Sequence, residues 1–332
     1  MSPKPVVALA QIVEHVRRVY GIDAREVGLA AGADAGVTVY RIGSDQGAYF
    51  LKLRAEQPES APLARWLADA GLTAVVAPVR PREEHLSTRI GGLTATIYPF
   101  VEGENGFHRP LNEDQWTALG AVVRAVHDFM LPRNVGESMR RETYSYASRA
   151  KVLAYLAAVP PQSLNDAVAR ELIALLRTRE LEIAALVEHA EQLAASLQQR
   201  VLPQVPSHGD LHAGNILIDR AGSLFIVDWD DAALAPKERD LMFVGGGVGG
   251  VWNRPHESAA FYRGYGPASV DAESLAFYRC QRVVEDVAVF CDQLLLEGGD
   301  QGAEREESLQ KLMAAFNPND VVEIAERTFA AL

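Results

Sequence analysis

The chain has 332 residues, of which 48% are hydrophobic and 23% charged, a composition typical of a globular protein long enough for two domains. Its 32 basic and 44 acidic residues give a net charge of −12, which repels nucleic-acid phosphates and attracts cations, so we expect no nucleic-acid partner. No segment approaches the roughly 18 uncharged apolar residues that span a bilayer, and the first twenty residues include charged side chains. We therefore expect no membrane association and a cytoplasmic protein.

The first hundred residues are predicted to be rich in strands. Alternating or β-branched runs recur at residues 36–43, 48–54, 74–79, 85–90 and 93–100. The first two flank a turn and predict a β-hairpin, and the other three are expected to complete a small sheet. Apolar residues at helical spacing predict helices near 5–20 and over 59–70.

The composition changes near residue 101, and the remainder is predicted to be mostly helical. Asn112 is a candidate N-cap with Gln115 three residues later, followed by an apolar stripe that runs to Met130. Further helices are expected at 166–200 (one long helix or two in series), 274–297 and 304–331.

A loop and a second short hairpin interrupt these helices at 201–229. The pattern predicts an α+β protein of two lobes, a small β-rich lobe at 1–101 and a larger helical lobe at 102–332.

The two cysteines, Cys280 and Cys291, fall in one predicted helix, which separates them by about 16 Å at 1.5 Å per residue. That separation is too large for a disulfide. Neither has the spacing of zinc ligands or of a redox pair, so two isolated thiols indicate a reducing compartment.

The segment HGDLHAGN places the carboxylate of Asp210 five residues before the amide of Asn215. Kinase catalytic loops have this spacing in HRDxxxxN, where the Asp orients the nucleophile and the Asn binds magnesium. Asp228 ends the second hairpin, thirteen residues after Asn215, where kinases have a second magnesium ligand. Mg²⁺ prefers oxygen ligands together with phosphates and water. We therefore predict Asp210 as the catalytic residue and Asn215 and Asp228 as ligands of Mg²⁺.

Each of these residues alone is also explained as a turn or capping residue. Their order and spacing favour the phosphoryl-transfer site. The segments HGDLHAGN and IVDWDD resemble the aminoglycoside phosphotransferase and choline kinase superfamily. Within it, DWDDAALAPKERDLMFVGGG, FYRCQRVVEDVAVFCDQL and YPFVEGENGF are similar to the spectinomycin phosphotransferases, so the resemblance covers nearly the whole chain.

The resemblance implies a protein-kinase-like fold, ATP or GTP as phosphoryl donor and a small cationic acceptor. It also implies that Asp240, in KERDLMF, braces the catalytic loop, and that His208 of the loop has a supporting role. No APE segment that would bind a protein substrate is present in the sequence, so no protein partner is implied.

Lys52 lies on the second strand of the first hairpin, where kinases place the lysine that holds the α- and β-phosphates. Phe50 shares its face of the strand and is expected beside the adenine, unless it is ordinary core. Glu59, or else Glu56, begins the next helix and is the candidate partner of Lys52. The helix dipole explains an acid at that position equally well.

The segment 97–102 ends the small sheet where a kinase hinge binds adenine through backbone groups. Pro99 lacks an N–H but keeps its carbonyl, so we predict the Pro99 carbonyl as acceptor and the Val101 N–H as donor.

Two glycine-rich segments are candidates for a phosphate-binding loop. Residues 32–36 are the only candidate in the first hairpin, which lacks GxGxxG, and Asp34 there would oppose the phosphate charge. Residues 245–250 lack the strand-to-helix context and the GK[ST] of a P-loop, so a flexible or tightly packed loop is expected.

For the acceptor, the resemblance implies a cationic aminocyclitol, with acidic residues pairing with its ammonium groups. The candidates are Asp230, Asp231, Glu285 and Asp286, with Glu285 preferred. One alternative is a metabolic kinase acting on choline, a homoserine-like alcohol or a sugar. The other is a nucleotide-binding module without catalysis, which the presence of every predicted catalytic residue argues against.

Overall fold

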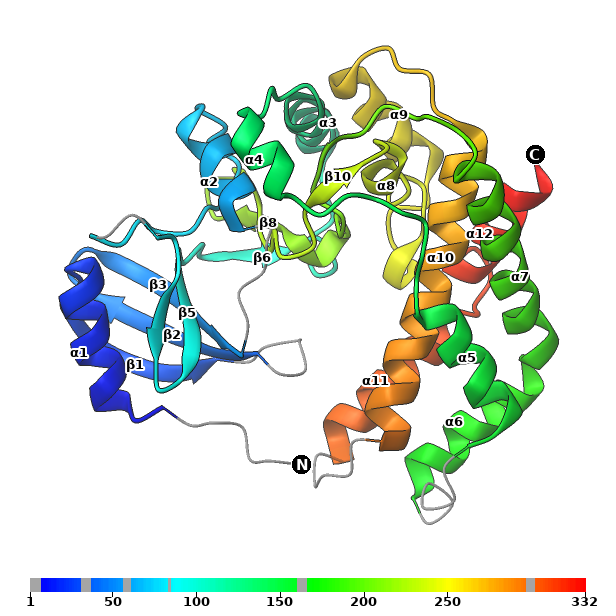
Figure 1. Ribbon diagram of the computed structural model, residues 1–332, viewed down its shortest axis with the longest axis horizontal. Coiled ribbons are helices and arrows are strands. Elements are labelled where there is room, and N and C mark those ends of the chain that lie inside the picture. The colour runs from blue at the N-terminus through cyan, green and yellow to red at the C-terminus, as the bar shows by residue number, and fades with distance from the viewer. Residues whose placement is uncertain (1–6, 31–36, 56–60, 83–84, 160–165, 297–301) are drawn as a thin grey trace.

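The structure is a computed structural model that describes residues 7–30, 37–55, 61–82, 85–159, 166–296 and 302–332. A small antiparallel sheet with α1 (Leu9–Tyr20) lies on one side of the molecule, and most helices lie on the other (Figure 1). The predicted α+β fold, with a small β-rich part and a larger helical part, is confirmed. In the described part of the chain, no helix is long and apolar enough to cross a membrane.

The five-stranded sheet has the order β1-β2-β3-β5-β4. Its strands are Ala24–Ala30 (β1), Thr38–Ser44 (β2), Gly47–Arg54 (β3), Thr88–Ile90 (β4) and Leu93–Pro99 (β5). The predicted hairpin is confirmed as β2 and β3, whereas β1 is a strand that the sequence analysis did not predict. Its residues AREVGLA alternate poorly and are mostly exposed or half-buried, so the sequence carries little strand signal there.

Side chains along β3 alternate between the core of the small lobe and the side that faces the second lobe. Leu51 and Leu53 are buried in the core between the sheet and α1, together with Ile12 and Val16 of that helix. Lys52, which stands between these two leucines, is on the opposite face of the strand and therefore points toward the second lobe.

The prediction that residues 74–79 belong to this sheet is wrong. Val75 forms an isolated parallel bridge with Ile226 of β9, and the Val76 N–H donates to the Ile226 carbonyl at 3.0 Å. The helix before this segment, α2 (Ala61–Asp69), places Leu63 and Leu67 in the same core as Trp116 of the helical part. A short apolar run fits any buried extended position, and here the long-range partner decides it.

In the helical part, α3 (Glu113–His127) begins with the predicted cap. Asn112 accepts from the Gln115 N–H at 2.8 Å, and the Gln115 side chain accepts from the Asn112 N–H at 3.0 Å. The predicted apolar stripe ends earlier than expected, because the helix stops at His127 and Met130 is 87% exposed.

Helix α9 (Pro255–Tyr265) packs closely on α3 through two glycines. A Cβ added to Gly120 would lie 2.0 Å from the Phe261 carbonyl oxygen, and one added to Gly264 would lie 1.8 Å from that of Thr117. Only glycine permits this separation of the two backbones.

A second group of helices forms the far side of the molecule (Figure 1). These are Ser148–Ala157 (α5), Ala167–Thr178 (α6), Glu180–Leu197 (α7), Ala272–Cys291 (α10), Gly302–Ala314 (α11) and Val321–Ala330 (α12). Residues 166–200 thus form two helices in series, one of the two predicted alternatives. Cys280 and Cys291 are buried free thiols on α10, as predicted.

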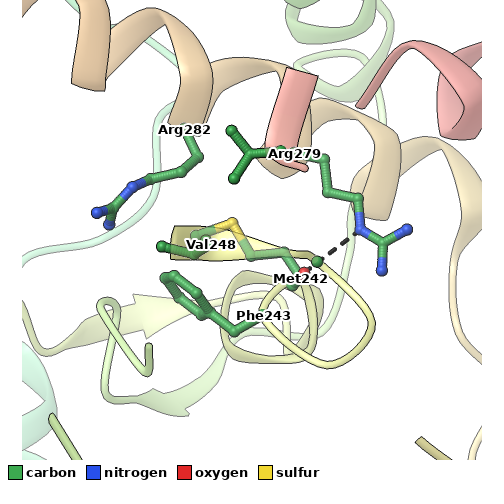
Figure 2. A pocket seen from close by; sticks show the side chains of 7 residues that line it. Met242, Phe243, Val248, Arg279 and Arg282 are labelled. Atoms are coloured by element: carbon green, nitrogen blue, oxygen red, sulfur yellow. Dashed lines mark hydrogen bonds between the residues drawn. The ribbon is translucent and has the colours of Figure 1, made fainter. Parts of the chain in front are cut away.

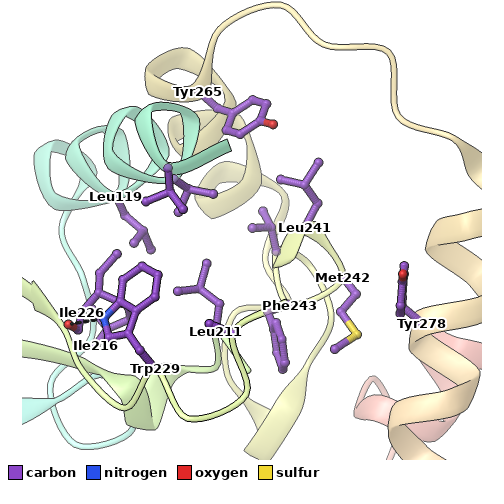
Figure 3. Close-up of a cluster of buried hydrophobic side chains, with 14 of the residues drawn as sticks. Leu119, Leu211, Ile216, Ile226, Trp229, Leu241, Met242, Phe243, Tyr265 and Tyr278 are labelled. Atoms are coloured by element: carbon purple, nitrogen blue, oxygen red, sulfur yellow. Dashed lines mark hydrogen bonds between the residues drawn. The ribbon is translucent and has the colours of Figure 1, made fainter. Parts of the chain in front are cut away.

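The predicted second hairpin is confirmed as β8 (Ile216–Asp219) and β9 (Leu224–Ile226), joined at its edge by β6 (Gly103–Asn105). Two further short strands, β7 (Val205–Ser207) and β10 (Ala233–Ala235), pair beside it, and α4 (Arg133–Ser138) and α8 (Glu238–Leu241) lie nearby (Figure 1). Leu211, Ile216, Ile226, Trp229 and Phe243 form the apolar core beneath this module (Figure 3).

Candidate active site

The loop between β7 and the 3-10 turn Ala213–Asn215 carries the predicted catalytic residue. Gly209 in this loop has φ of +86°, and a Cβ there would lie 2.3 Å from the Asp231 carbonyl oxygen. A side chain is therefore excluded on both counts, and the tight turn directs the Asp210 side chain out of the loop.

Asp240 of α8 holds this loop from below. Its Oδ2 accepts from the His208 N–H and its Oδ1 from the Gly209 N–H, each at 2.8 Å. His127 Nε2 lies 3.1 Å from the same Oδ2, and its Nδ1 lies 2.8 Å from the Tyr265 hydroxyl. Burial alone would raise the pKa of Asp240, but its bond with His127 and the backbone donors lower it. The structure thus places Asp240 in the bracing position expected for it.

His208 links the catalytic loop to the segment that carries Asp228. Its Nε2 lies 2.9 Å from the Val227 carbonyl oxygen, which can only accept, so Nε2 carries the proton. Nδ1 then accepts from the Asp210 N–H at 3.2 Å. One buried ring therefore fixes both chain segments of the site.

The carboxylate of Asp210 is 25% exposed and contacts three groups. Arg282 Nη1 donates to Oδ1, whereas His212 Nε2 and Asn215 Nδ2 each lie 3.4 Å from Oδ2. Burial alone would raise the pKa of Asp210, but Arg282, followed by His212, lowers it well below its usual range. Asp210 is therefore an anion at neutral pH.

Asn215 and Asp228 are brought together by the hairpin, because the Val227 N–H donates to the Asn215 carbonyl at 3.0 Å. The Asn215 amide nitrogen donates to the Asp210 carbonyl at 2.8 Å, so its Oδ1 is the atom available to a metal. Asp228 has φ of +60°, which is uncommon for a residue with a side chain and is typical of functional sites.

One amide oxygen and one carboxylate fit Mg²⁺, which binds few protein ligands and completes its octahedron with phosphate and water oxygens. The described residues contain no cluster of three or more His, Cys, Asp or Glu side chains that could enclose a metal.

Lys52 reaches this site from β3. Its Nζ lies 2.7 Å from Asp228 Oδ1 and 3.0 Å from Asp230 Oδ2, and Arg54 Nη2 contacts the same Asp230 oxygen at 2.8 Å. Burial raises the pKa of Asp228, and repulsion by Asp230 adds to this effect. Burial would raise the pKa of Asp230 too, but Lys52 and Arg54 lower it to about 2. Asp230, predicted to contact the acceptor, thus lies against Lys52 and Arg54 of β3.

The hinge candidates lie at the end of β5. The Phe100 N–H donates to the Ala48 carbonyl at 2.9 Å, so Phe100 still follows β3. Because backbone groups of an extended chain alternate in direction, we predict that the Pro99 carbonyl and the Val101 N–H face the opposite edge. Phe50 packs on Phe100, with ring centroids 4.8 Å apart. Their contacts with adenine remain predictions.

The other predicted acceptor contacts lie around α10. Asp286 Oδ1 pairs with Arg282 Nε at 3.0 Å, and the exposed Asp231 pairs with Arg140 at 3.3 Å. The Glu285 side chain makes no hydrogen bond or ion pair with the residues that the structure describes. Burial raises the pKa of Glu285 to about 7, although Arg282 and nearby cations oppose this.

The remaining predictions concern one helix start and two glycine-rich segments. Glu59, Glu56 and the loop 32–36 lie outside the described residues. The glycine segment 245–250 is tightly packed, because a Cβ on Gly246 would lie 2.2 Å from the Met242 carbonyl oxygen. The sequence analysis expected either a flexible or a tightly packed loop here, and the structure has the tightly packed one.

Sequence reasoning missed Arg54, His212 and Arg282. Arg54 and His212 stand within two residues of predicted site residues, so proximity was an available signal. Arg282 gave none, because it is 72 residues from Asp210 and its pairing with Asp286 is an ordinary i,i+4 pattern.

A two-lobed fold, a catalytic loop with Asp and Asn five residues apart, and a strand lysine paired with the second acidic motif define a kinase-type phosphotransferase with an alcohol acceptor. The family model described as "Phosphotransferase enzyme family" matches residues 28–278. The chain belongs to this family, as its motifs predicted.

Similar solved structures agree. A spectinomycin phosphotransferase, APH(9)-Ia, in complex with ADP and spectinomycin is 35% identical, with a TM-score of 0.86, covering 96% of this chain and 98% of its own. Its AMP-bound complex gives 34% identity, a TM-score of 0.83, and coverage of 97% and 99%.

A choline/ethanolamine kinase family protein from Mesorhizobium loti shares the fold, with 15% identity, a TM-score of 0.55, and coverage of 98% and 99%. A comparison with curated protein sequences gave no significant match.

Proposed function

We propose that this protein transfers the γ-phosphoryl group of a magnesium-bound nucleotide to a hydroxyl of a cationic aminocyclitol, with spectinomycin as the preferred acceptor. The observation that carries the substrate is the 35% identity, over 96% of the chain, to a phosphotransferase solved with ADP and spectinomycin. The acidic side chains near Asp210 support a cationic acceptor.

On the donor side, the largely buried Lys52 is held by Asp228 and Asp230, which keep its ammonium group charged beside the proposed phosphate site. Asn215 Oδ1 and Asp228 would hold Mg²⁺, which neutralises charge on the β- and γ-phosphates when bound. Arg54 keeps Asp230 ionised and so helps to fix the lysine.

On the acceptor side, Asp286 and Asp231 are already paired with arginines, whereas Glu285 has no direct partner among the described residues. A carboxylate in this state gains most from a bound cation, because an ammonium group would stabilise its charged form. Glu285 is therefore the residue we assign to an ammonium group of the acceptor.

The reaction is a direct in-line transfer. The acceptor oxygen attacks the γ-phosphorus as the bond to the β-phosphate oxygen breaks, and the acceptor proton passes to Asp210. Asp210 suits this role because it is ionised, partly exposed and fixed by the braced loop. No covalent enzyme intermediate is needed.

The test is magnesium-dependent nucleotide consumption by the purified protein with spectinomycin, run beside choline, homoserine and kanamycin. Asp210→Asn should abolish turnover, by about 10²-fold or more, while nucleotide affinity persists. Asp23→Asn is the matched control, because Asp23 is 73% exposed before β1 and, in the described part of the chain, pairs only with the equally exposed Arg17. Turnover of choline or homoserine alone would reject the aminocyclitol, and silence with all acceptors would reject the proposed activity.

A further inference from the structure

Arg282 connects the acceptor face of α10 to the catalytic loop. Its Nη1 donates to Asp210 Oδ1, and its Nε donates to Asp286, 3.0 Å from Oδ1 and 3.1 Å from Oδ2. The three side chains are only 20 to 27% exposed, so this bridge is shielded from water. A shielded guanidinium between two carboxylates has a more fixed position than a surface pair.

The guanidinium group of Arg282 also packs on an aromatic ring. Its guanidinium carbon lies 5.6 Å from the centroid of the Phe243 ring. Figure 2 shows Arg282 and Arg279 leaving α10 in opposite directions on either side of a small pocket lined by Met242, Phe243 and Val248. Arg279 binds the Met242 and Val244 carbonyls and thus ties α10 to the chain after α8, whereas Arg282 faces the reacting carboxylate.

The contact divides the two oxygens of Asp210 between two roles. Oδ1 is held by Arg282, whereas the groups near Oδ2, on His212 and Asn215, lie at 3.4 Å, the long end of hydrogen-bonding distances, and hold it more weakly. Oδ2 is therefore the oxygen that can receive a hydroxyl proton.

We propose that Arg282, anchored by Asp286, is a positioning residue for phosphoryl transfer, which holds Asp210 through Oδ1 and directs Oδ2 at the acceptor hydroxyl. This inference rests on the proposed function of Asp210. The opposing possibility is that Arg282 occupies the place of the acceptor cation and is displaced by it. The two possibilities predict opposite effects on activity. Removing a positioning residue lowers kcat, whereas removing a competing cation lowers the KM of the acceptor.

The experiment compares wild type with Arg282→Met, Arg282→Lys and Arg282→Ala, using the acceptor that wild type phosphorylates. We expect Arg282→Met to lower kcat about 10²-fold with nucleotide KM changed less than about twofold. Arg282→Lys should lose nearly as much kcat, because the shorter lysine side chain carries one ammonium group, which does not bridge both carboxylates. Millimolar guanidinium, but not urea, should restore part of the activity of Arg282→Ala.

Arg200→Met is the matched control, since Arg200 also bridges two carboxylates, Asp271 and Glu273, at the other end of α10. It should leave kcat unchanged. An unchanged kcat in Arg282→Met, or a lower acceptor KM with higher activity, would overturn the positioning role. Wild type that turns over no acceptor would instead reject the proposed function.

Crystal structures of wild type and Arg282→Met provide a readout that needs no acceptor. The Asp210 carboxylate should rotate or become disordered in the variant while Asn215 and Asp240 stay in place. An Asp210 side chain that keeps its orientation without Arg282 would refute the inference, whatever the kinetics.

Discussion

Replacing Asp240 by Asn should separate the bracing of the catalytic loop from its chemistry, because Asp240 touches no reacting atom. The carboxylate is 1% exposed and receives the His208 N–H, the Gly209 N–H and His127 Nε2 on its two oxygens. Asn offers one acceptor oxygen and an NH₂ group in place of the other. At least one of the two backbone donors then faces another donor and has no partner.

A hydrogen bond to a charged group contributes about 1.5–3 kcal/mol, and an unsatisfied buried donor costs about 1–3 kcal/mol. We therefore expect Asp240→Asn to lose about 2–4 kcal/mol of unfolding free energy, a large part of the roughly 5–15 kcal/mol of a typical protein. Because the loop loses a fixed end, kcat should also fall, by about 10- to 100-fold.

Urea unfolding and steady-state kinetics at pH 7 measure both effects, with Asp23→Asn, which breaks only an exposed pair with Arg17, as the control that should lose less than about 1 kcal/mol and no activity. The pKa of Asp240 is lowered in the folded state, so its stabilisation is present above the unfolded value of about 3.9 and is lost as pH falls through the folded pKa. The difference between wild type and variant should shrink toward pH 3. Equal stability and equal kcat at pH 7 would refute the bracing argument.

Two further predictions concern packing and charge. Gly264→Ala should destabilise the protein by about 2 kcal/mol in urea unfolding, because its Cβ would overlap the Thr117 carbonyl oxygen. Gly136→Ala is the control: its Cβ would have its nearest neighbour at 4.0 Å, so the variant should instead gain up to about 1 kcal/mol of unfolding free energy. Equal effects of the two substitutions would contradict the close-approach argument. Glu285→Gln should raise the KM of a cationic acceptor about tenfold or more. Burial raises the pKa of Glu285 to about 7, so wild type loses stability as the pH rises from about 4.3 through 7. The variant should therefore be more stable than wild type above pH 7, by on the order of 1–2 kcal/mol. A thermal-unfolding midpoint that is the same in both proteins at every pH would contradict this.

The residues nearest the chemistry could be predicted from the sequence because short-range geometry brings them together. Asp210, Asn215 and Asp228 lie within one loop and one hairpin. In the hairpin, a backbone hydrogen bond between Val227 and Asn215 sets Asp228 beside Asn215. Spacing along the chain therefore translates directly into distance in the site. Lys52 was predictable for a different reason, since strand alternation fixed its face and the small sheet has one open side toward the second lobe.

Positions set by long-range pairing could not be predicted in this way. Residues 74–79 carry the pattern of a strand, yet Ala74 and Val76 bond to Ile226 of β9, and only the Val79 N–H reaches the first sheet, at the Ile97 carbonyl. Nothing in a short apolar run specifies which edge it joins. Asp230 shows the same limit on a smaller scale, because the sequence identifies an acid beside Asp228, whereas the positions of Lys52 and Arg54 decide which side of the site it serves.

Arg282 shows why the same local pattern can have different consequences. Arg124 and Asp128 on α3 repeat its i,i+4 spacing with Asp286, but those side chains are 41% and 61% exposed, where such a pair contributes about 0–1 kcal/mol. Around Arg282 the exposures fall to 20% and 27%, and a third group, the Asp210 carboxylate, completes the bridge. That third partner comes from the packing of α10 against the loop, so an unremarkable helical pair becomes a contact with the reacting carboxylate.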